Sequence, residues 1–186
     1  MRVIAGTLKG RRLATPAWPG LRPTSDRLRE TLFNVLAPEI PGARVLDLYA
    51  GTGALGIEAL SRGAGHVVFV DEDRRAEALV AENLARCGLL NGYVIIRASV
   101  ALAIEQLVQS AHDPFDIVLL DPPYAPESRS SFEAILAGAG RVLARTGVAV
   151  LEHSRRQPAP ARSGELVLSR GVRAGDSVLS FYRFHR

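Results

Sequence analysis

Hydrophobic positions follow two different periods along this chain. Short runs rich in β-branched residues alternate with segments whose apolar residues recur at helical spacing. The candidate strands lie at 43–48, 66–71, 93–98 and 115–121, and the candidate helices between them lie at 54–63, 74–88 and 100–111. Strands that alternate with helices in this way predict βαβ units and a parallel sheet covered on both faces. We therefore expect an α/β fold of the Rossmann-like kind.

The N-terminal pattern differs from that of the middle. Two short β-prone segments at 2–6 and 11–15 predict a small N-terminal β-hairpin. A helix is expected over 25–37, with Thr24 or Ser25 as its cap. Its apolar stripe consists of Leu28, Leu32, Val35 and Leu36. Such a helix packs with this stripe and offers its arginines to a partner.

The C-terminal pattern turns antiparallel. A further helix at about 128–143 and a strand at 147–153 come first. Two β-rich runs follow, at 165–170 and 177–184, and the turn-rich segment 171–176 between them predicts an antiparallel hairpin at the sheet edge. The complete expectation is a mainly parallel, seven-stranded sheet with an antiparallel C-terminal strand.

Length and composition agree with one domain. The chain has 186 residues, of which 47% are hydrophobic, enough for a sizeable core. We expect a single domain over 1–186, with a basic hairpin and helix at 1–40 and the Rossmann-like core at 41–186. No run of about 18 apolar residues is present, and the basic residues near the start follow the apolar stretch instead of preceding it. We therefore predict a cytoplasmic protein.

Cysteine and histidine usage argues against a metal centre. Cys87 is the only cysteine, which excludes an internal disulfide and makes a thiolate zinc site implausible. The four histidines lie far apart in sequence, at 66, 112, 153 and 185. We interpret them as surface or packing residues and predict no metal.

Positive charge is concentrated at the start of the chain. The first 30 residues contain seven basic and two acidic side chains, whereas the net charge of the whole chain is +4. An asymmetric basic segment on an otherwise neutral domain is typical of a polyanion-binding face. The alternative is a solvated arm in an arginine-rich protein, since Lys9 is the only lysine. The candidate nucleic-acid contacts are Arg2, Lys9, Arg11, Arg12, Arg22, Arg27 and Arg29.

A glycine loop follows the first strand of the core. Gly51, Gly53 and Gly56 have G-x-G-x-x-G spacing directly after a strand and at the start of a helix, a context that indicates a nucleotide-type site. Asp71 ends the next strand, at a suitable distance to accept hydrogen bonds from ribose hydroxyls. Two kinds of cofactor fit, a nicotinamide or flavin dinucleotide and S-adenosylmethionine.

Asp47 favours S-adenosylmethionine. A carboxylate four residues before Gly51 faces the pyrophosphate of a dinucleotide unfavourably. S-adenosylmethionine has no phosphate and carries an ammonium and a sulfonium, which acidic residues attract. The alternative is that Asp47 only braces the loop and that the glycines serve a tight turn.

The fourth core strand ends in LLDPPY, residues 119–124. Pro122 and Pro123 have no backbone N–H, so the ladder stops there and the chain leaves the sheet at the edge where open α/β sheets bind ligands. Asp121 and the Pro122 carbonyl can each accept one N–H of an exocyclic amino group on a base, and Tyr124 can stack on that base. The alternative is an ordinary turn with a surface tyrosine.

Taken together, these segments resemble a known family. LRPTSDRLRETLFNVL, LDLYAGTGALGIEALSRGA, FVDED, LLDPPY and the terminal GDSVLSFYR look like the bacterial ribosomal small-subunit methyltransferase D family, over nearly the whole chain. The resemblance implies a Rossmann-like S-adenosylmethionine-dependent methyltransferase fold. It also implies methyl transfer to the N2 amino group of one guanine in 16S rRNA, with a partly or fully assembled small subunit as partner.

The resemblance also implies roles for particular residues. The matched catalytic motif is Asp121, Pro122, Pro123 and Tyr124. The matched cofactor-binding positions are Asp47, Tyr49, Ala50, Gly51, Thr52, Gly53, Asp71, Glu72, Ser99 and Val100. Two positions depart from the pattern: Asp71 stands where glutamate is usual, and Ser99 where Asp or Asn faces the adenine amino group. A backbone contact from Ser99 or Val100 can replace that side chain.

Three other functions stay open at the level of the residues. An adenine-N6 methyltransferase of DNA or RNA uses the same Asp-Pro-Pro-Tyr acceptors, although this chain has no inserted target-recognition domain. An enzyme that methylates a protein glutamine amide favours Asn at position 121. An inactive RNA-binding module could lose the acidic and glycine positions, which are all present here.

Overall fold

The computed structural model describes residues 1–186 except 17, 19–24, 111–112, 124–128 and 186. Within this part, one sheet contains strands β1 (Arg44–Leu48), β2 (His66–Asp71), β3 (Tyr93–Arg97), β4 (Phe115–Leu120), β5 (Leu143–Ser154), β6 (Arg162–Ser163), β7 (Leu166–Ala174) and β8 (Ser177–Phe184). The helices are α1 (Asp26–Leu36), η1 (Ala37–Glu39), α2 (Ala54–Ser61), α3 (Arg74–Arg86), α4 (Val100–Gln109) and α5 (Arg129–Val142).

The strand order is β3-β2-β1-β4-β5-β8-β7-β6. The first five strands in this order are parallel, and the last three pair antiparallel with their neighbours. The chain winds outward from β1 in one direction to β3, then returns beside β1 with β4 and continues to β5. Because ligands of open α/β sheets bind where the winding reverses, the edge beyond β1 and β4 is the expected site.

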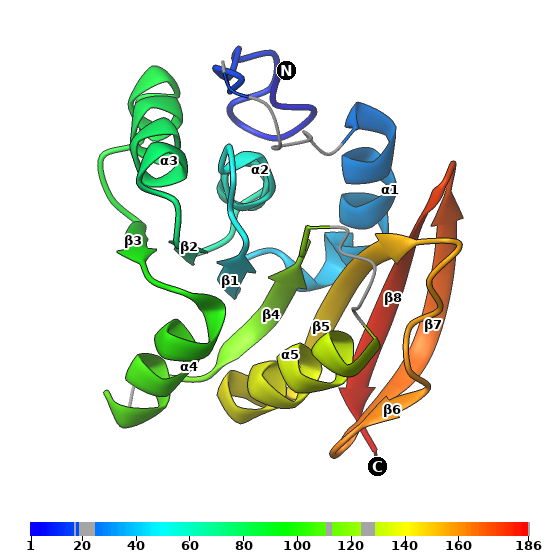
Figure 1. Ribbon diagram of the computed structural model, residues 1–186. Helices are drawn as coiled ribbons and strands as arrows, with labels where there is room; N and C mark the ends of the chain where they lie inside the picture. The colour runs from blue at the N-terminus through cyan, green and yellow to red at the C-terminus, as the bar shows by residue number, and fades with distance from the viewer. Residues whose placement is uncertain (17, 19–24, 111–112, 124–128, 186) are drawn as a thin grey trace.

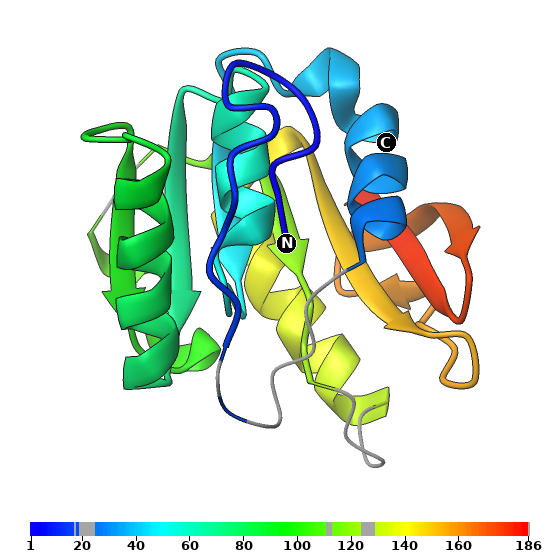
Figure 2. The same cartoon turned by 90° about the horizontal axis from the view of Figure 1, so that it is seen from above.

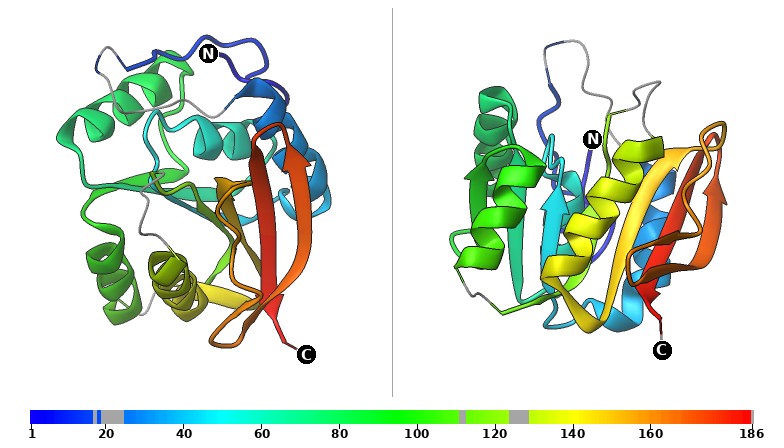
Figure 3. Two further views of the ribbon diagram at one scale, coloured as in Figure 1. Left: turned by 45° about the vertical axis from the view of Figure 1, so that its right-hand side comes forward. Right: turned by 60° about the horizontal axis from the view of Figure 1, so that its bottom comes forward.

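Helices cover both faces of the sheet. Figure 1 shows α1, α2 and α3 on one side of the strands and α4 and α5 on the other. Each face has its own buried apolar cluster, one around Phe33, Ile57 and Phe69, the other around Phe115 and Leu136. The views in Figure 3 show that α4 and α5 lie side by side, while β7 and β8 extend the sheet beyond α5. This arrangement confirms the predicted Rossmann-like α/β class.

The antiparallel end of the sheet is larger than predicted. A two-residue strand, β6, adds an eighth strand between β5 and β7, where the sequence pattern predicts none. Most of 171–176, predicted as a turn, belongs to β7, because the register continues to Ala174 opposite Ser177. The turn contains only Gly175 and Asp176, and Gly175 has a φ of 67°, which suits the first position of a two-residue hairpin turn.

The N-terminal segment pairs with itself over a very short distance. Arg2 and Arg12 form an isolated antiparallel bridge, supported by a 2.9 Å bond from the Val3 N–H to the Arg11 carbonyl. The ladder does not extend along the predicted hairpin, because the next backbone N–H groups, those of Ile4 and Ala5, donate to the carboxylate of Glu58. The following helix begins as predicted, with the Ser25 hydroxyl accepting from the Leu28 N–H at 3.2 Å.

Candidate active site

The glycine loop connects β1 to α2 by a tight turn. The Ala50 N–H donates to Val70 O at 2.9 Å, and the Gly53 N–H donates to Ala50 O at 2.7 Å. Gly53 has a φ of 75° and starts α2, a conformation that favours glycine. Gly56 permits close packing, because a Cβ there would lie 2.2 Å from the ring of Phe69. The glycines thus serve the tight turn and the close packing of α2, and their predicted role in binding a cofactor stays a prediction.

Tyr49 has an unusual backbone conformation. Its φ is 65°, and among the described residues Tyr49 is the one non-glycine residue with a positive φ. Such a conformation costs of order 1–3 kcal/mol. Its side chain lies in the cavity wall, and burial, followed by the nearby charge of Glu72, raises the pKa of its hydroxyl. Strained residues of this kind cluster at ligand sites, which agrees with Tyr49 as a predicted contact.

Two aspartates hold the loop by accepting backbone hydrogen bonds. One oxygen of Asp71 accepts the Gly51 N–H at 2.9 Å, and the other accepts the Asp73 N–H at 2.9 Å. One oxygen of Asp47 accepts the Gly56 N–H at 2.9 Å. Asp71 links the ends of β1 and β2 at the cavity, whereas Asp47 is buried below the loop.

A cavity of about 1250 Å³ lies over the carboxyl ends of β1, β2, β3 and β4. It brings together most of the predicted site residues, namely Tyr49, Ala50, Gly51, Thr52, Asp71, Glu72, Ser99, Val100, Asp121, Pro122 and Pro123. Tyr124 lies outside the described residues. Asp47 and Gly53 are not among the lining residues: Asp47 accepts the Gly56 N–H of α2 and Gly53 shapes the turn, and their role as cofactor contacts stays a prediction.

The other wall of the cavity comes from α4 and α5. Its apolar part includes Ile104 and Ile135, and an ion pair between Arg141 and Glu105 joins the two helices at the same wall. Sequence reasoning missed these residues, because their helical spacing is that of ordinary packing faces. Their common position becomes apparent only when α4 and α5 lie side by side.

Ser99 has a structural role in this wall. Its hydroxyl accepts the Leu102 N–H at 3.3 Å and caps the N-terminus of α4. The departure from Asp or Asn therefore leaves a side chain that is engaged with its own helix. A backbone contact from Ser99 or Val100 remains the proposal for adenine recognition.

Asp47 is placed in an electrostatically unfavourable environment. Burial raises the pKa of its carboxyl well above the ordinary value of 3.8, and the charges of Asp121 and Asp71 raise it further, whereas the Gly56 N–H opposes the shift. The charges of Asp121 and Asp71 thus lie near the loop. A bound cation would be stabilised by this negative field, and a bound phosphate would be repelled.

This shift predicts how stability depends on pH. A carboxyl whose pKa is raised on folding binds more protons in the native state, so its contribution is present below the unfolded pKa and is lost as pH rises through the folded pKa. We expect the stability of Asp47→Asn relative to wild type to increase as pH rises above 3.8. Denaturant unfolding of both proteins from pH about 4 to 8 measures this difference. A difference independent of pH contradicts the assignment.

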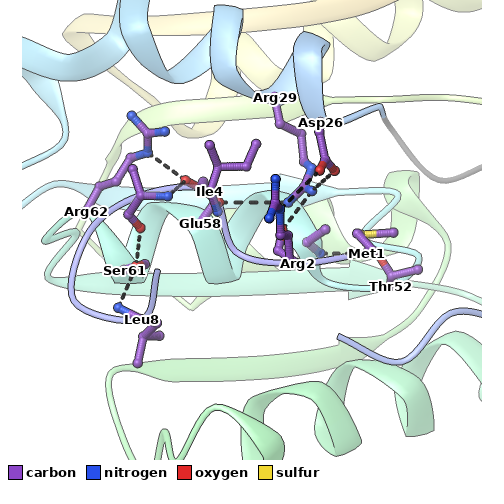
Figure 4. Close-up of polar contacts among 12 residues, drawn as sticks. Met1, Arg2, Ile4, Leu8, Asp26, Arg29, Thr52, Glu58, Ser61 and Arg62 are labelled. Carbon is purple, nitrogen blue, oxygen red and sulfur yellow. Dashed lines mark hydrogen bonds and ion pairs between the residues drawn. The ribbon is translucent and has the colours of Figure 1, made fainter. Parts of the chain in front are cut away.

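Arg29 does not have its predicted role. Its side chain is fully buried, and its Nη2 donates to Arg2 O at 2.8 Å and to Asp26 at 2.6 Å. Its Nη1 lies 3.8 Å from buried Glu58, as Figure 4 shows. The prediction that Arg29 contacts nucleic acid is therefore wrong: it faces inward from α1 and joins α1 to the N-terminal segment.

The N-terminal segment is fastened along α2 and α3. Glu58 accepts the N–H groups of Ile4 and Ala5 at 2.8 and 3.0 Å, and the Ser61 hydroxyl accepts the Leu8 N–H at 3.0 Å (Figure 4). Ser61 is the last residue of α2, so the turn that carries Lys9 lies away from the glycine loop. Lys9 is exposed there, beside the C-terminal end of α2.

Asn83 joins this segment to the glycine loop. Its amide Nδ2 donates to Thr52 O at 2.8 Å and to Ala14 O at 3.2 Å, and its Oδ1 accepts the Ala14 N–H at 2.6 Å. The side chain is fully buried. The sequence signal for Asn83 is a polar residue on the face of α3 that also carries Ala76, Leu79 and Val80. Arg2, Arg11, Arg12 and Arg27 are exposed, so their contact with nucleic acid stays a prediction, and Arg22 lies outside the described residues.

Known proteins share both the sequence and the fold. The family model "Conserved hypothetical protein 95" matches residues 1–183. "Putative rRNA methyltransferase YlbH" of Bacillus subtilis is 36% identical over 183 residues, 98% of each chain. "Ribosomal RNA small subunit methyltransferase D" of Escherichia coli K12 is 45% identical over 124 residues, 67% of this chain and 60% of that protein.

Solved structures agree with this result. "Putative methyltransferase yhhF" from Escherichia coli is 32% identical, with a TM-score of 0.80 over 100% of this chain and 98% of that one. Hypothetical protein TTHA0928 of Thermus thermophilus is 30% identical, with a TM-score of 0.84 over 98% and 99% of the two chains.

The fold and the cavity define this protein as one of the Rossmann-like S-adenosylmethionine-dependent methyltransferase class. Within that class, the chain belongs to the ribosomal RNA small subunit methyltransferase D family. The resemblance stated from the motifs is confirmed. In the described residues, no helix has the length and apolar character needed to cross a membrane.

Proposed function

We propose that this protein transfers a methyl group from S-adenosylmethionine to the exocyclic N2 amino group of one guanine in 16S rRNA. The observation that carries the proposal is the position of Asp121 and Pro122, at the end of β4 and in the wall of the glycine-loop cavity. Family membership supports the substrate, since the relatives from Escherichia coli and Haemophilus influenzae are named for the small-subunit RNA. A partly or fully assembled small subunit is the proposed partner.

The residues in the cavity fit S-adenosylmethionine. Glu72 has an exposed carboxylate at the end of β2, within the cavity wall, where it can accept from ribose hydroxyls beside Asp71. The apolar side chains of Val100 and Ile135 suit the faces of an adenine ring. The negative field of the loop suits the ammonium and sulfonium groups and disfavours a pyrophosphate.

The bound cofactor supplies an electrophilic methyl group on a sulfonium. Asp121 and the Pro122 carbonyl would hold the amino group by accepting one hydrogen bond from each of its two N–H groups. This orientation would direct the nitrogen lone pair at the methyl carbon. The carboxylate of Asp121 would stabilise the positive charge that develops on the amino nitrogen as this atom takes the methyl group from the sulfonium, and one amino proton would then pass to water. We also propose that Tyr124 stacks on the base.

Transfer of a tritiated methyl group to several acceptors tests this function. The acceptors are small ribosomal subunits, protein-free 16S rRNA and duplex DNA, each prepared without the modification. We expect label in the subunits or the 16S rRNA and none in DNA. Label in DNA would favour an adenine-N6 methyltransferase, which uses the same acceptor groups, and would overturn the proposed substrate.

A further inference from the structure

The strand order divides the catalytic edge of the sheet into two halves. The cavity lies over the ends of β3, β2, β1 and β4. These four strand ends form the half of the edge where we propose that the cofactor binds, and Asp121 marks its limit. Beyond β4 come β5, β8 and β7. Since β8 runs antiparallel to both neighbours, β5 and β7 are parallel, and both end at the edge that contains Asp121. In Figure 2 the arrowheads of β2 and β5 point toward this edge, at the bottom of the picture.

Exposed arginines occupy the second half of this edge. Arg155 and Arg156 directly follow β5, and Arg173 lies one residue before the end of β7. All three side chains are exposed, and none forms an ion pair with a carboxylate of the described residues. Their positive charge is therefore not neutralised by an ion pair within the described residues and can attract an anionic partner.

Hydrogen bonds hold the turn that carries Arg155 and Arg156 beside the end of β7, where Arg173 lies. The Arg155 N–H donates to Asp176 O at 2.9 Å, which ties the turn after β5 to the turn between β7 and β8. Buried His153 contacts Gln157 O through Nδ1 at 2.9 Å and Ser180 through Nε2 at 2.8 Å, so the turn after β5 is anchored to β8. Asp176 is the exposed acid on these turns, and the local charge remains positive.

We propose that Arg155, Arg156 and Arg173, the β5–β7 surface, bind the phosphate backbone of the RNA beside the target nucleotide. This inference rests on the proposed function, which requires a base to reach Asp121 from the side that the cofactor does not occupy. Unpaired guanidinium groups suit phosphates, because their planar fork can donate two hydrogen bonds to one phosphate. The N-terminal segment offers fewer phosphate contacts than its charge predicts, since Arg29 is buried and Lys9 lies beside the C-terminal end of α2, away from the glycine loop.

The salt dependence of RNA binding measures how many phosphate contacts the β5–β7 surface makes. Each phosphate contact on a single strand contributes about 0.7 to the slope of log K against log salt, so three contacts contribute about 2. We expect the triple variant R155Q/R156Q/R173Q to flatten this slope by about that amount for protein-free 16S rRNA. It should also raise the KM for the RNA substrate at least about tenfold at physiological salt. The kcat at saturating RNA and the Kd of S-adenosylmethionine should change less than about twofold.

A matched control separates local contacts from net charge. R86Q/R145Q/R162Q removes the same charge from exposed arginines at the end of α3, the start of β5 and β6, on the opposite edge of the sheet. The inference is overturned if both triple variants have the same slope and KM, or if the β5–β7 variant loses only kcat. Failure of the proposed function has a different signature, namely that wild-type protein transfers no methyl group to RNA. Binding of 16S rRNA across salt then still decides whether this surface contacts RNA.

Discussion

Replacing Asp121 with alanine is expected to lower methyl transfer at least about a hundredfold, with cofactor affinity nearly unchanged. The side chain lies at the end of β4 in the cavity wall, while the loop that borders the cofactor site is held by other groups, including Asp71. Loss of one preorganised group that stabilises developing charge typically costs 10²–10³ in kcat. Asp121→Asn is expected to be impaired too, because it removes the negative charge. Single-turnover transfer of labelled methyl measures the rate, and calorimetry measures cofactor binding.

A matched carboxylate controls for general effects of the substitution. Asp113 is exposed and precedes the other end of β4, so Asp113→Ala should keep the wild-type rate. Near-wild-type turnover by Asp121→Ala would contradict the proposed catalytic role of Asp121. An equally large loss of cofactor affinity would instead assign Asp121 to cofactor binding.

Replacing Glu58 with glutamine is expected to lower the free energy of unfolding by about 3 to 5 kcal/mol. The carboxylate is fully buried and accepts two backbone N–H groups and the Nε of Arg62 at 2.8 Å, beside buried Arg29. Glutamine keeps the size of the side chain but cannot neutralise these guanidinium groups, and its amide has one acceptor oxygen. Breaking a buried pair from one side leaves a buried charge uncompensated.

An exposed pair of the same type provides the comparison. Glu82 and Arg86 lie one turn apart on α3, each about half exposed. Glu82→Gln should change stability by less than about 1 kcal/mol, because solvent screens such pairs. Denaturant unfolding of the three proteins gives the difference. If Glu58→Gln and Glu82→Gln destabilise equally, the buried cluster does not fasten the N-terminal segment.

The sequence predicted the core of the fold because its signals are local. β-branched runs, helical spacing and the glycine loop each depend on neighbouring residues, and they correctly indicated the order of strands and helices through β5. The turn of 171–176 was misjudged because Gly171 sits inside β7, where pairing with β8 overrides the local preference.

The site was predicted where motifs are contiguous and missed where it depends on packing. Tyr49 to Thr52 and Asp121 to Pro123 follow strand ends and do line the cavity. Arg29 was assigned from charge alone, but its position on the helix turns it inward, onto Glu58 and Asp26. The wall formed by α4 and α5 required knowledge of how two helices, separated by β4, lie beside each other.

Mapping of the methylated nucleoside tests whether this protein methylates N2 of a guanine in 16S rRNA. Purified protein and S-adenosylmethionine carrying an isotope-labelled methyl group are incubated with small subunits from a strain that lacks the corresponding methyltransferase. The rRNA is then digested and analysed by mass spectrometry. The account predicts one labelled N2-methylguanosine at a single position of 16S rRNA, absent with Asp121→Ala. Labelled N6-methyladenosine, or label absent from 16S rRNA, would contradict it.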